Sequence, residues 1–186
     1  TSIGGAITNM GVLLSGKTIV NLNYSASKLS MSSAIDQADI KTIYTSKLFI
    51  EKLKNRGIDF SDCFGNIDLV FLEELKQTIS KLELVCYWLT TWLPSPLLRF
   101  FYSHNHNADD TAAIMFSSGS EGIPKGICLS HRNIMANLKQ ISDVLNTEST
   151  DVVMASLPLF HAFGLTVTQF MPLIEGLPMV CHPDPT

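Results

Sequence analysis

Residues 112–126 read Ala112-Ala113-Ile114-Met115-Phe116-Ser117-Ser118-Gly119-Ser120-Glu121-Gly122-Ile123-Pro124-Lys125-Gly126. The first five are apolar and predict a buried strand, and the others form a turn-prone loop. Glycines let the backbone turn its N–H groups toward an anion, and serine hydroxyls add rotatable donors. Lys125 supplies a cation, and Pro124 fixes the chain just before it. The loop therefore predicts a polyphosphate cradle, although its composition alone also fits a solvated loop.

The pattern around this stretch alternates apolar runs with helical periodicity. Helices are predicted over residues 3–14, from Ser25 or Ser27 to about Gln37, over 47–55, from an N-cap at Ser130 to Leu145, and over 164–174. Strands are predicted over residues 18–22, 40–44, 67–72, 112–116, 151–157 and 177–181. Such alternation is typical of an α/β fold with a mostly parallel sheet flanked by helices.

Composition excludes several classes of protein. Of the 186 residues, 46% are apolar and 16% charged, which argues against disorder, and the net charge of −4 gives no reason to expect a nucleic-acid partner. The cysteines are widely scattered and indicate buried thiols in a reducing compartment: Cys63, Cys86, Cys128 and Cys181. The chain opens on Thr1 and stops directly after a predicted strand, so we expect it to be part of a longer protein.

Residues 73–102 break the alternation of strands and helices. They are apolar and aromatic, but Glu83, Pro94, Pro96 and Arg99 interrupt them too often for a membrane-spanning helix. Tryptophan and tyrosine beside an arginine suit a bilayer interface, and an insertion packed on the domain is an equal alternative. The membrane interpretation involves Trp88, Trp92 and Phe100. A polar linker follows, and its His104 and His106 are interpreted as solvated, so no metal site is assigned.

A second candidate loop has the literal P-loop pattern, from Gly11 to Lys17 and Thr18. A working P-loop follows a strand and opens a helix. Here the pattern lies at the end of a predicted helix and precedes a predicted strand. The context therefore favours a helix that ends at Gly16, and a nucleotide hydrolase that uses Lys17 and Thr18 is the alternative.

The turn Pro158-Leu159-Phe160-His161-Ala162-Phe163-Gly164 closes the next predicted strand and opens the next helix. Ligands of open α/β sheets gather at the carboxyl ends of the strands. The turn and the loop at 117–126 follow successive predicted βα units, so we expect both to face one crevice. Phe160, His161 and Gly164 are then the predicted substrate pocket, with His161 lining an apolar slot.

Together the two segments resemble the adenylate-forming superfamily, which includes acyl-CoA synthetases, luciferases and peptide-synthetase adenylation domains. Most members have threonine where this chain has Glu121. With glutamate there, the loop is similar to that of the acyl-[acyl-carrier-protein] synthetase module of bacterial 2-acylglycerophosphoethanolamine acyltransferase. The same subgroup is supported by the segments Asn21-Leu22-Asn23-Tyr24 and Phe163-Gly164-Leu165-Thr166-Val167. The resemblance implies a partial AMP-binding domain, part of the family's large N-terminal domain. Its predicted parts are residues 1–72 with the first βα units, 73–111 with the insertion and linker, and 112–186 with the phosphate loop and substrate turn.

The resemblance implies that a fatty-acid carboxylate attacks the α-phosphorus of MgATP. A carrier-protein thiol would then take the acyl group, and in the parent protein a lysophospholipid would receive it. The implied ATP-binding residues are Ser117, Ser118, Gly119, Ser120, Glu121, Gly122 and Lys125. Lys125 would also be catalytic, because it offsets the charge on the departing pyrophosphate.

Other family elements would lie after Thr186, including most ligands of Mg²⁺ and a mobile domain with its own lysine. The fragment itself is therefore expected to be soluble and inactive, and the parent to work at the cytoplasmic face of a bacterial inner membrane. An acyl-CoA ligase is the alternative within the enzymes. A non-catalytic module that docks a partner through residues 88–102 is an alternative from another class.

Overall fold

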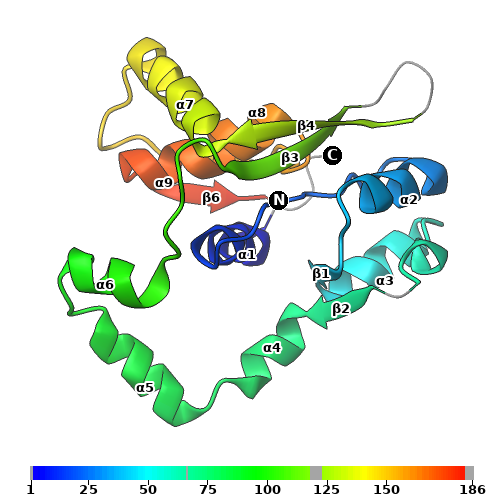
Figure 1. The fold of residues 1–186 in the computed structure, drawn as a ribbon, viewed down its shortest axis with the longest axis horizontal. Helices are drawn as coiled ribbons and strands as arrows, with labels where there is room; N and C mark the ends of the chain where they lie inside the picture. Colours follow the sequence, from blue (N-terminus) through cyan, green and yellow to red (C-terminus); the bar gives the residue numbers. More distant parts are fainter. Residues whose placement is uncertain (1, 66, 118–122, 183–186) are drawn as a thin grey trace.

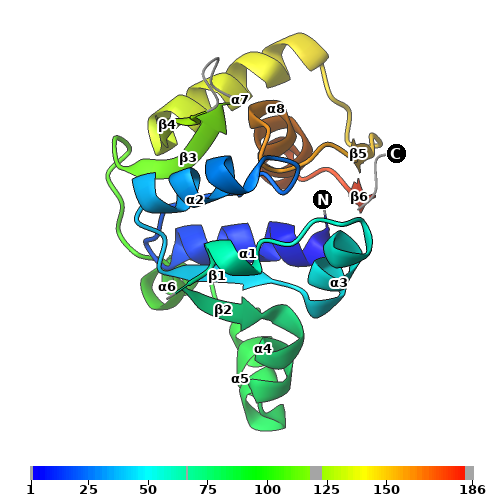
Figure 2. The same cartoon turned by 90° about the vertical axis from the view of Figure 1, so that its right-hand side faces the viewer.

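The computed structural model describes residues 2–65, 67–117 and 123–182, which alternate helices with short strands (Figures 1 and 2). The elements are α1 (Ile3–Leu14), α2 (Lys28–Gln37), β1 (Thr42–Thr45), α3 (Lys47–Asn55), the 3₁₀ turn η1 (Ser61–Cys63), β2 (Asp68–Phe71), α4 (Leu72–Thr78), α5 (Lys81–Thr90), α6 (Ser95–Tyr102), β3 (Thr111–Ser117), β4 (Lys125–Ser130), α7 (His131–Leu145), β5 (Val153–Ala155), α8 (Ala162–Leu165), the π-helical turn η2 (Thr166–Phe170), α9 (Met171–Glu175) and β6 (Met179–Cys181). The α/β fold predicted from the sequence is confirmed.

Serine side chains set where the predicted helices begin. The hydroxyl of Ser27 accepts a hydrogen bond from the backbone N–H of Ser30, and that of Ser130 accepts one from Asn133. Asn133 Oδ1 in turn accepts a hydrogen bond from the backbone N–H of Ser130, which completes a capping box at the start of α7. Gly57 takes a φ of +77° beyond the end of α3, a conformation that glycine adopts at little cost.

The strands of the described residues form three separate pairs instead of one continuous sheet. β1 pairs with β2 and β5 with β6 in parallel, whereas β3 pairs with β4 antiparallel. The strand predicted over residues 18–22 is wrong, because the pairing there consists of one parallel bridge between Ile19 and Ala113. Ile19 donates to the Ala112 carbonyl and accepts from the Ile114 N–H, and the ladder goes no further.

The helix predicted over residues 164–174 begins earlier, at Ala162, and has a π-helical turn in its middle. Such a turn removes carbonyls from the usual i→i−4 pattern. Two threonine hydroxyls bond carbonyls four residues back: Thr166 Oγ1 donates to the Ala162 carbonyl at 2.8 Å and Thr168 Oγ1 to the Gly164 carbonyl at 2.5 Å.

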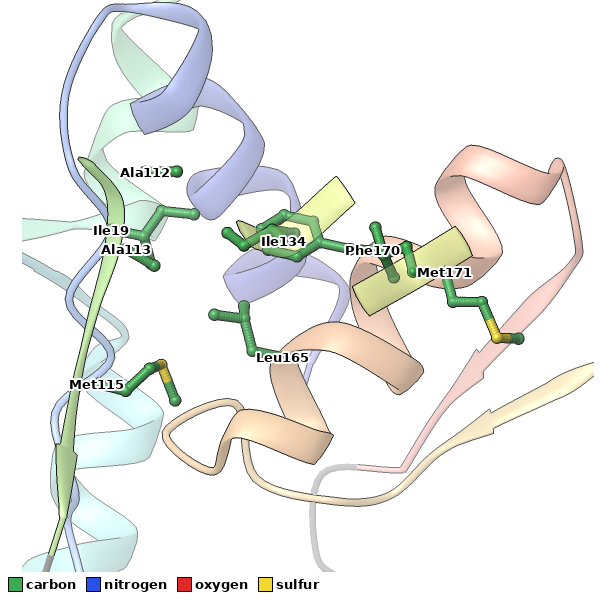
Figure 3. Packing of buried hydrophobic residues seen from close by; sticks show 9 residues of the cluster. Ile19, Ala112, Ala113, Met115, Ile134, Leu165, Phe170 and Met171 are labelled. Carbon is green, nitrogen blue, oxygen red and sulfur yellow. The ribbon is translucent and has the colours of Figure 1, made fainter. Parts of the chain in front are cut away.

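The main core lies between β3, α7 and the helical segment 162–175 (Figure 3). Its buried members are Ile19, Ala112, Ala113, Met115, Ile134, Leu138, Leu165, Phe170 and Met171. A buried amide pair joins α1 to this core. Gln169 is fully buried, its Oε1 accepts from Asn9 Nδ2 at 2.8 Å, and its Nε2 donates to the Ala6 carbonyl at 3.1 Å.

Residues 72–102 fold into three helices, of which α4 and α5 project away from the rest of the molecule in both views (Figures 1 and 2). Neither α5 nor α6 contains a buried residue. The prediction that this region is not a spanning helix agrees with the structure. Throughout the described ranges, every helix is too short or too polar to cross a bilayer.

The buried Gln169 generates the first prediction. Replacing Gln169 by leucine should lower the free energy of unfolding by roughly 1–3 kcal/mol, because the Asn9 amide and the Ala6 carbonyl lose their partner in an apolar site. Urea denaturation followed by circular dichroism measures the change. Gln140→Leu on the exposed face of α7 is the matched control and should stay within about 0.5 kcal/mol of wild type. Equal effects of the two substitutions would contradict this account.

Candidate functional site

The two ends of the predicted phosphate loop lie directly opposite each other. Ser117 ends β3, Lys125 begins β4, and the two are partners in the antiparallel register. Next to them, Phe116 pairs with Gly126, and a Cβ at Gly126 would lie 3.2 Å from the Phe116 ring. Both Ser117 and Lys125 are exposed. The structure thus places a serine and a lysine opposite each other in the strand register at the mouth of the predicted loop.

This arrangement corrects one expectation from the sequence. The loop was expected to follow a strand within a βα unit, but it joins the two strands of a β-hairpin. Among the described residues, strand pairing therefore holds the two ends of the predicted phosphate loop, and the helix that follows, α7, begins only after β4. Ser118, Gly119, Ser120, Glu121 and Gly122 lie outside the described residues.

Gln37 holds the far end of the loop, a role that no pattern in the sequence indicates. Its Nε2 donates to the carbonyl of Pro124 at 2.9 Å and to Ser33 Oγ at 2.9 Å. Pro124 is buried against this contact. The backbone just before Lys125 is thereby tied to α2, at a distance of 87 residues in the sequence. A glutamine at the end of a predicted helix gives no local sign of such a role.

The predicted substrate turn is built around Gly164. A Cβ at this position would lie 2.1 Å from the Pro158 carbonyl oxygen, far inside van der Waals contact. Only glycine lets the start of α8 pack so closely on the preceding turn. His161 is the N-cap residue of α8: its N–H donates to the Pro158 carbonyl at 3.1 Å, and its own carbonyl accepts from Leu165 at 2.9 Å.

Aromatic rings fix the orientation of this turn. Phe160 is 9% exposed, and its ring centroid lies 4.5 Å from that of His161. Tyr24 packs edge-on against Phe160 at 5.2 Å and against Phe49 of α3 at 5.2 Å. His161 itself is exposed. The imidazole is therefore presented at the surface on a buried aromatic support, and Tyr24 is a second contributor that sequence reasoning did not assign to the pocket.

The two predicted segments meet through the core beneath them. Met115 of β3 and Leu165 of α8 belong to the same buried cluster and point toward each other in Figure 3. The described polar contacts do not join the two segments to each other. The loop is bonded to Gln37, and His161 is bonded to the Pro158 carbonyl. The structure thus joins the supports of loop and turn. A crevice shared by their functional side chains stays a prediction.

The literal P-loop pattern has no P-loop structure. Gly11 lies inside α1, which ends at Leu14 with Ser15 as its C-cap. Gly16 takes a φ of +80°, and a Cβ there would lie 2.8 Å from the His104 ring. Lys17 and Thr18 lie outside any helix, and the Thr18 hydroxyl donates to the Thr111 carbonyl at 3.0 Å. The interpretation as a helix end is confirmed.

Three histidines lie close together near the end of α1, away from the predicted site: His104, His106 and His131. His106 Nε2 lies 3.1 Å from the Leu13 carbonyl, and the ring centroids of His106 and His131 are 4.9 Å apart. Partial burial first, and then the charge of His106, lowers the pKa of His131. No cluster of three or more histidine, cysteine or acidic side chains within residues 2–65, 67–117 and 123–182 is arranged to hold a metal ion.

Comparisons with known proteins identify similar sequences and similar folds. The family model described as AMP-binding enzyme matches residues 1–186. A probable 4-coumarate–CoA ligase 2 of Dictyostelium discoideum is 30% identical over 93% of this chain and 33% of its own length. The chloroplastic long-chain-fatty-acid–[acyl-carrier-protein] ligase AEE15 of Arabidopsis thaliana is 42% identical over 31% of the chain and 8% of its own length. The chain spans about a third of the 4-coumarate–CoA ligase that it matches.

Solved structures share the fold. MatB of Rhodopseudomonas palustris with bound ATP superposes with a TM-score of 0.72 at 20% identity, over 99% of this chain and 34% of that one. O-succinylbenzoate coenzyme A synthetase of Bacillus subtilis in complex with AMP gives a TM-score of 0.74 at 20% identity, over 99% of this chain and 41% of that one.

Gly164 generates the second prediction. Gly164→Ala should lower the free energy of unfolding by about 1–3 kcal/mol or more, because the new methyl group meets a backbone carbonyl that cannot move without opening the turn. Gly11→Ala is the matched control, since nothing lies within 4 Å of its Cβ position. Gly11 lies within α1, so alanine there should stabilise by up to ~1 kcal/mol. Thermal unfolding of both variants measures the difference, and a neutral Gly164→Ala would contradict the close packing.

Proposed function

Because this chain belongs to the AMP-binding enzyme family, we propose that it forms part of an enzyme that activates a fatty acid with ATP. The pairing of Ser117 with Lys125 at the mouth of the loop carries the proposal. The oxygens of a polyphosphate are bound by hydrogen-bond donors and by cations. The serine hydroxyl supplies a donor, and the lysine ammonium group supplies a cation. The family relationship supports a ligase; the acyl substrate and the acceptor go beyond it.

The proposed first step is nucleophilic substitution at phosphorus. A carboxylate oxygen of the fatty acid forms a bond to the α-phosphorus of ATP, and the bond from that phosphorus to the bridging oxygen breaks. Acyl-adenylate forms, and pyrophosphate leaves with the electron pair of the broken bond. Mg²⁺ would offset part of the phosphate charge, with most of its ligands contributed by regions outside this chain.

Lys125 and the loop would stabilise the leaving group. Negative charge grows on pyrophosphate as the bond breaks, and a fixed cation lowers the barrier most where charge develops. Ser117 would donate to a phosphate oxygen, with Ser118, Ser120 and the backbone at Gly119 and Gly122 completing the cradle. Glu121 would face the metal or point away, because a carboxylate repels phosphate. Gln37 would keep the Lys125 backbone in place through Pro124.

Phe160, His161 and Gly164 would border the acyl group. The buried Phe160 ring supplies an apolar wall, and the exposed imidazole of His161 lies over it. Gly164 lets the turn pack close enough to hold both. The slot would thus combine apolar surface for a hydrocarbon chain with one polar group near the carboxylate.

The acceptor of the activated acyl group is proposed to be the thiol of an acyl carrier protein. The thiolate sulfur would attack the carbonyl carbon of acyl-adenylate and release AMP. In the parent protein, a hydroxyl oxygen of a lysophospholipid would then attack the carbonyl carbon of the thioester, form an ester and release the carrier thiol. The likeness to a fatty-acid–[acyl-carrier-protein] ligase supports this choice, as does glutamate at position 121. Coenzyme A is the second candidate, which the likeness to 4-coumarate–CoA ligases favours. The parent would act at the cytoplasmic face of a bacterial inner membrane.

Pyrophosphate exchange tests the first step. In the full-length protein, Lys125→Ala should slow fatty-acid-dependent ATP–pyrophosphate exchange by about 10² or more, because one positioned charge donor is lost. Lys17→Ala is the matched control and should leave exchange unchanged. Exchange that survives Lys125→Ala would remove this lysine from the mechanism. Absent exchange with Lys17-dependent phosphate release would favour a nucleotide hydrolase instead.

A competition assay tests the acceptor. With labelled fatty acid and ATP, equal concentrations of acyl carrier protein and coenzyme A should give mainly acylated carrier protein. The ratio of the two kcat/KM values is read from the labelled products. A ratio that favours coenzyme A would assign the protein to the acyl-CoA ligases and leave the adenylation step intact.

A further inference from the structure

The α5–α6 hairpin, defined as residues 80–103, is held together mainly by contacts between its own residues. The Ser80 hydroxyl and the Glu83 side chain form a capping box at its start. Its two helices are joined by Tyr102, whose hydroxyl donates to Thr90 Oγ1 at 3.4 Å and whose ring lies 6.5 Å from that of Tyr87. The described contacts of the hairpin are thus largely internal.

Its apolar side chains face away from the protein core. Five of them each expose 60% or more of their surface: Leu82, Trp88, Trp92, Phe100 and Phe101. Trp88 and Trp92 contact each other edge-on at 6.2 Å, and so do Phe100 and Phe101 at 5.4 Å. The aromatic groups therefore form two exposed clusters, one at the end of α5 and one on α6. Exposed apolar surface of this extent indicates a binding partner.

The dimensions and composition suit the surface of a bilayer. Helices of 10 and 8 residues are about 15 Å and 12 Å long, well short of the ~30 Å hydrocarbon core. Tryptophan and tyrosine prefer the interface, where the ring is apolar and one edge stays hydrated. The hairpin carries two cations, Lys81 and Arg99, against the single anion Glu83, whereas the whole chain has a net charge of −4. It is thus locally suited to anionic headgroups.

Arg99 lies beside the aromatic cluster of α6 in an open cavity of about 330 Å³. The cavity is lined by Ser95, Pro96, Arg99, Phe100, Ser103 and Asn105. None of the ion pairs within the described ranges involves Arg99. Phe100 lines the cavity and is 79% exposed, so its insertion would bring the guanidinium to headgroup depth. A planar fork of N–H donors matches the oxygens of a phosphate group.

We propose that the α5–α6 hairpin docks on a phospholipid surface, with Trp88, Trp92 and Phe100 inserted at the interface and Arg99 bound to a lipid phosphate. The proposal deepens the proposed function and rests on it for the choice of a membrane as partner, because a lysophospholipid acceptor resides there. Docking would place the acyl-transfer machinery beside that acceptor.

Vesicle co-sedimentation of the full-length protein tests the docking, without ATP or fatty acid. Vesicles of phosphatidylethanolamine and phosphatidylglycerol should bind the wild type. Combined Trp88→Ser, Trp92→Ser and Phe100→Ser should weaken partitioning by at least about tenfold. The matched control removes three exposed apolar groups from α7, as Met135→Ser, Val144→Ser and Leu145→Ser, and should bind like wild type. Circular dichroism checks that both variants are folded.

A separate substitution and a competition with inorganic phosphate test the contact between Arg99 and a lipid phosphate. Arg99→Gln should weaken vesicle binding by about fivefold, the effect of one cation near an anionic surface. Millimolar inorganic phosphate should leave wild-type binding unchanged if the site takes a lipid phosphate, whereas displacement by phosphate would assign the cavity to a free anion. Unchanged binding of Arg99→Gln would overturn the phosphate contact.

The docking proposal and the proposed function fail separately. Pyrophosphate exchange that persists in a wild type that does not bind vesicles would overturn docking alone. Vesicle binding without exchange would leave docking standing and overturn fatty-acid activation. Dimerisation is measured by analytical ultracentrifugation for the wild type and the hairpin variants. If the hairpin substitutions change dimerisation and leave vesicle binding unchanged, a second copy of the chain covers the hairpin and the proposal is overturned.

Discussion

The hydrogen bonds of Gln169 are the constraint on which the arrangement of the chain depends. One fully buried amide binds Asn9 and the Ala6 carbonyl, so the first helix is tied to the helical segment that follows the predicted substrate turn. A buried amide must find both its donors and its acceptor in one geometry, whereas an apolar contact tolerates sliding. The pair therefore fixes which turn of α1 meets which turn of η2, and the core packs around that choice.

The candidate site relies on rigid supports of different kinds. Strand pairing between Ser117 and Lys125 and the bond from Gln37 to Pro124 hold the loop at its base. Close packing at Gly164 and the ring of Tyr24 hold the turn. Preorganised supports matter for phosphate chemistry because a cation is effective only when it needs no rearrangement as charge develops. These supports come from elements widely separated in the sequence, which explains why a whole domain is needed to position few functional groups.

Much of the local structure could be predicted from the sequence, because its causes are local. Serine caps such as Ser27 and Ser130 and the apolar stripe of α7 predicted their helices, and the helix context of Gly11 correctly excluded a P-loop. The strand β4 was missed because its apolar run is only three residues long between Gly126 and Ser130. The roles of Gln37, Tyr24 and Gln169 depend on partners 87 or more residues away, which no local pattern encodes. The functions of the loop residues stay predictions.

The π-helical turn at Thr166–Phe170 accommodates an extra residue within the helical segment that carries Gln169. It holds one residue more per turn than an α-helix would, and successive α-helical residues are about 100° apart around the axis. If the segment became a regular α-helix while it kept all its residues, the extra residue would rotate the imidazole-bearing turn against the anchored Gln169 by about that angle. The wider turn therefore absorbs one residue and keeps the imidazole-bearing turn in phase with the first helix.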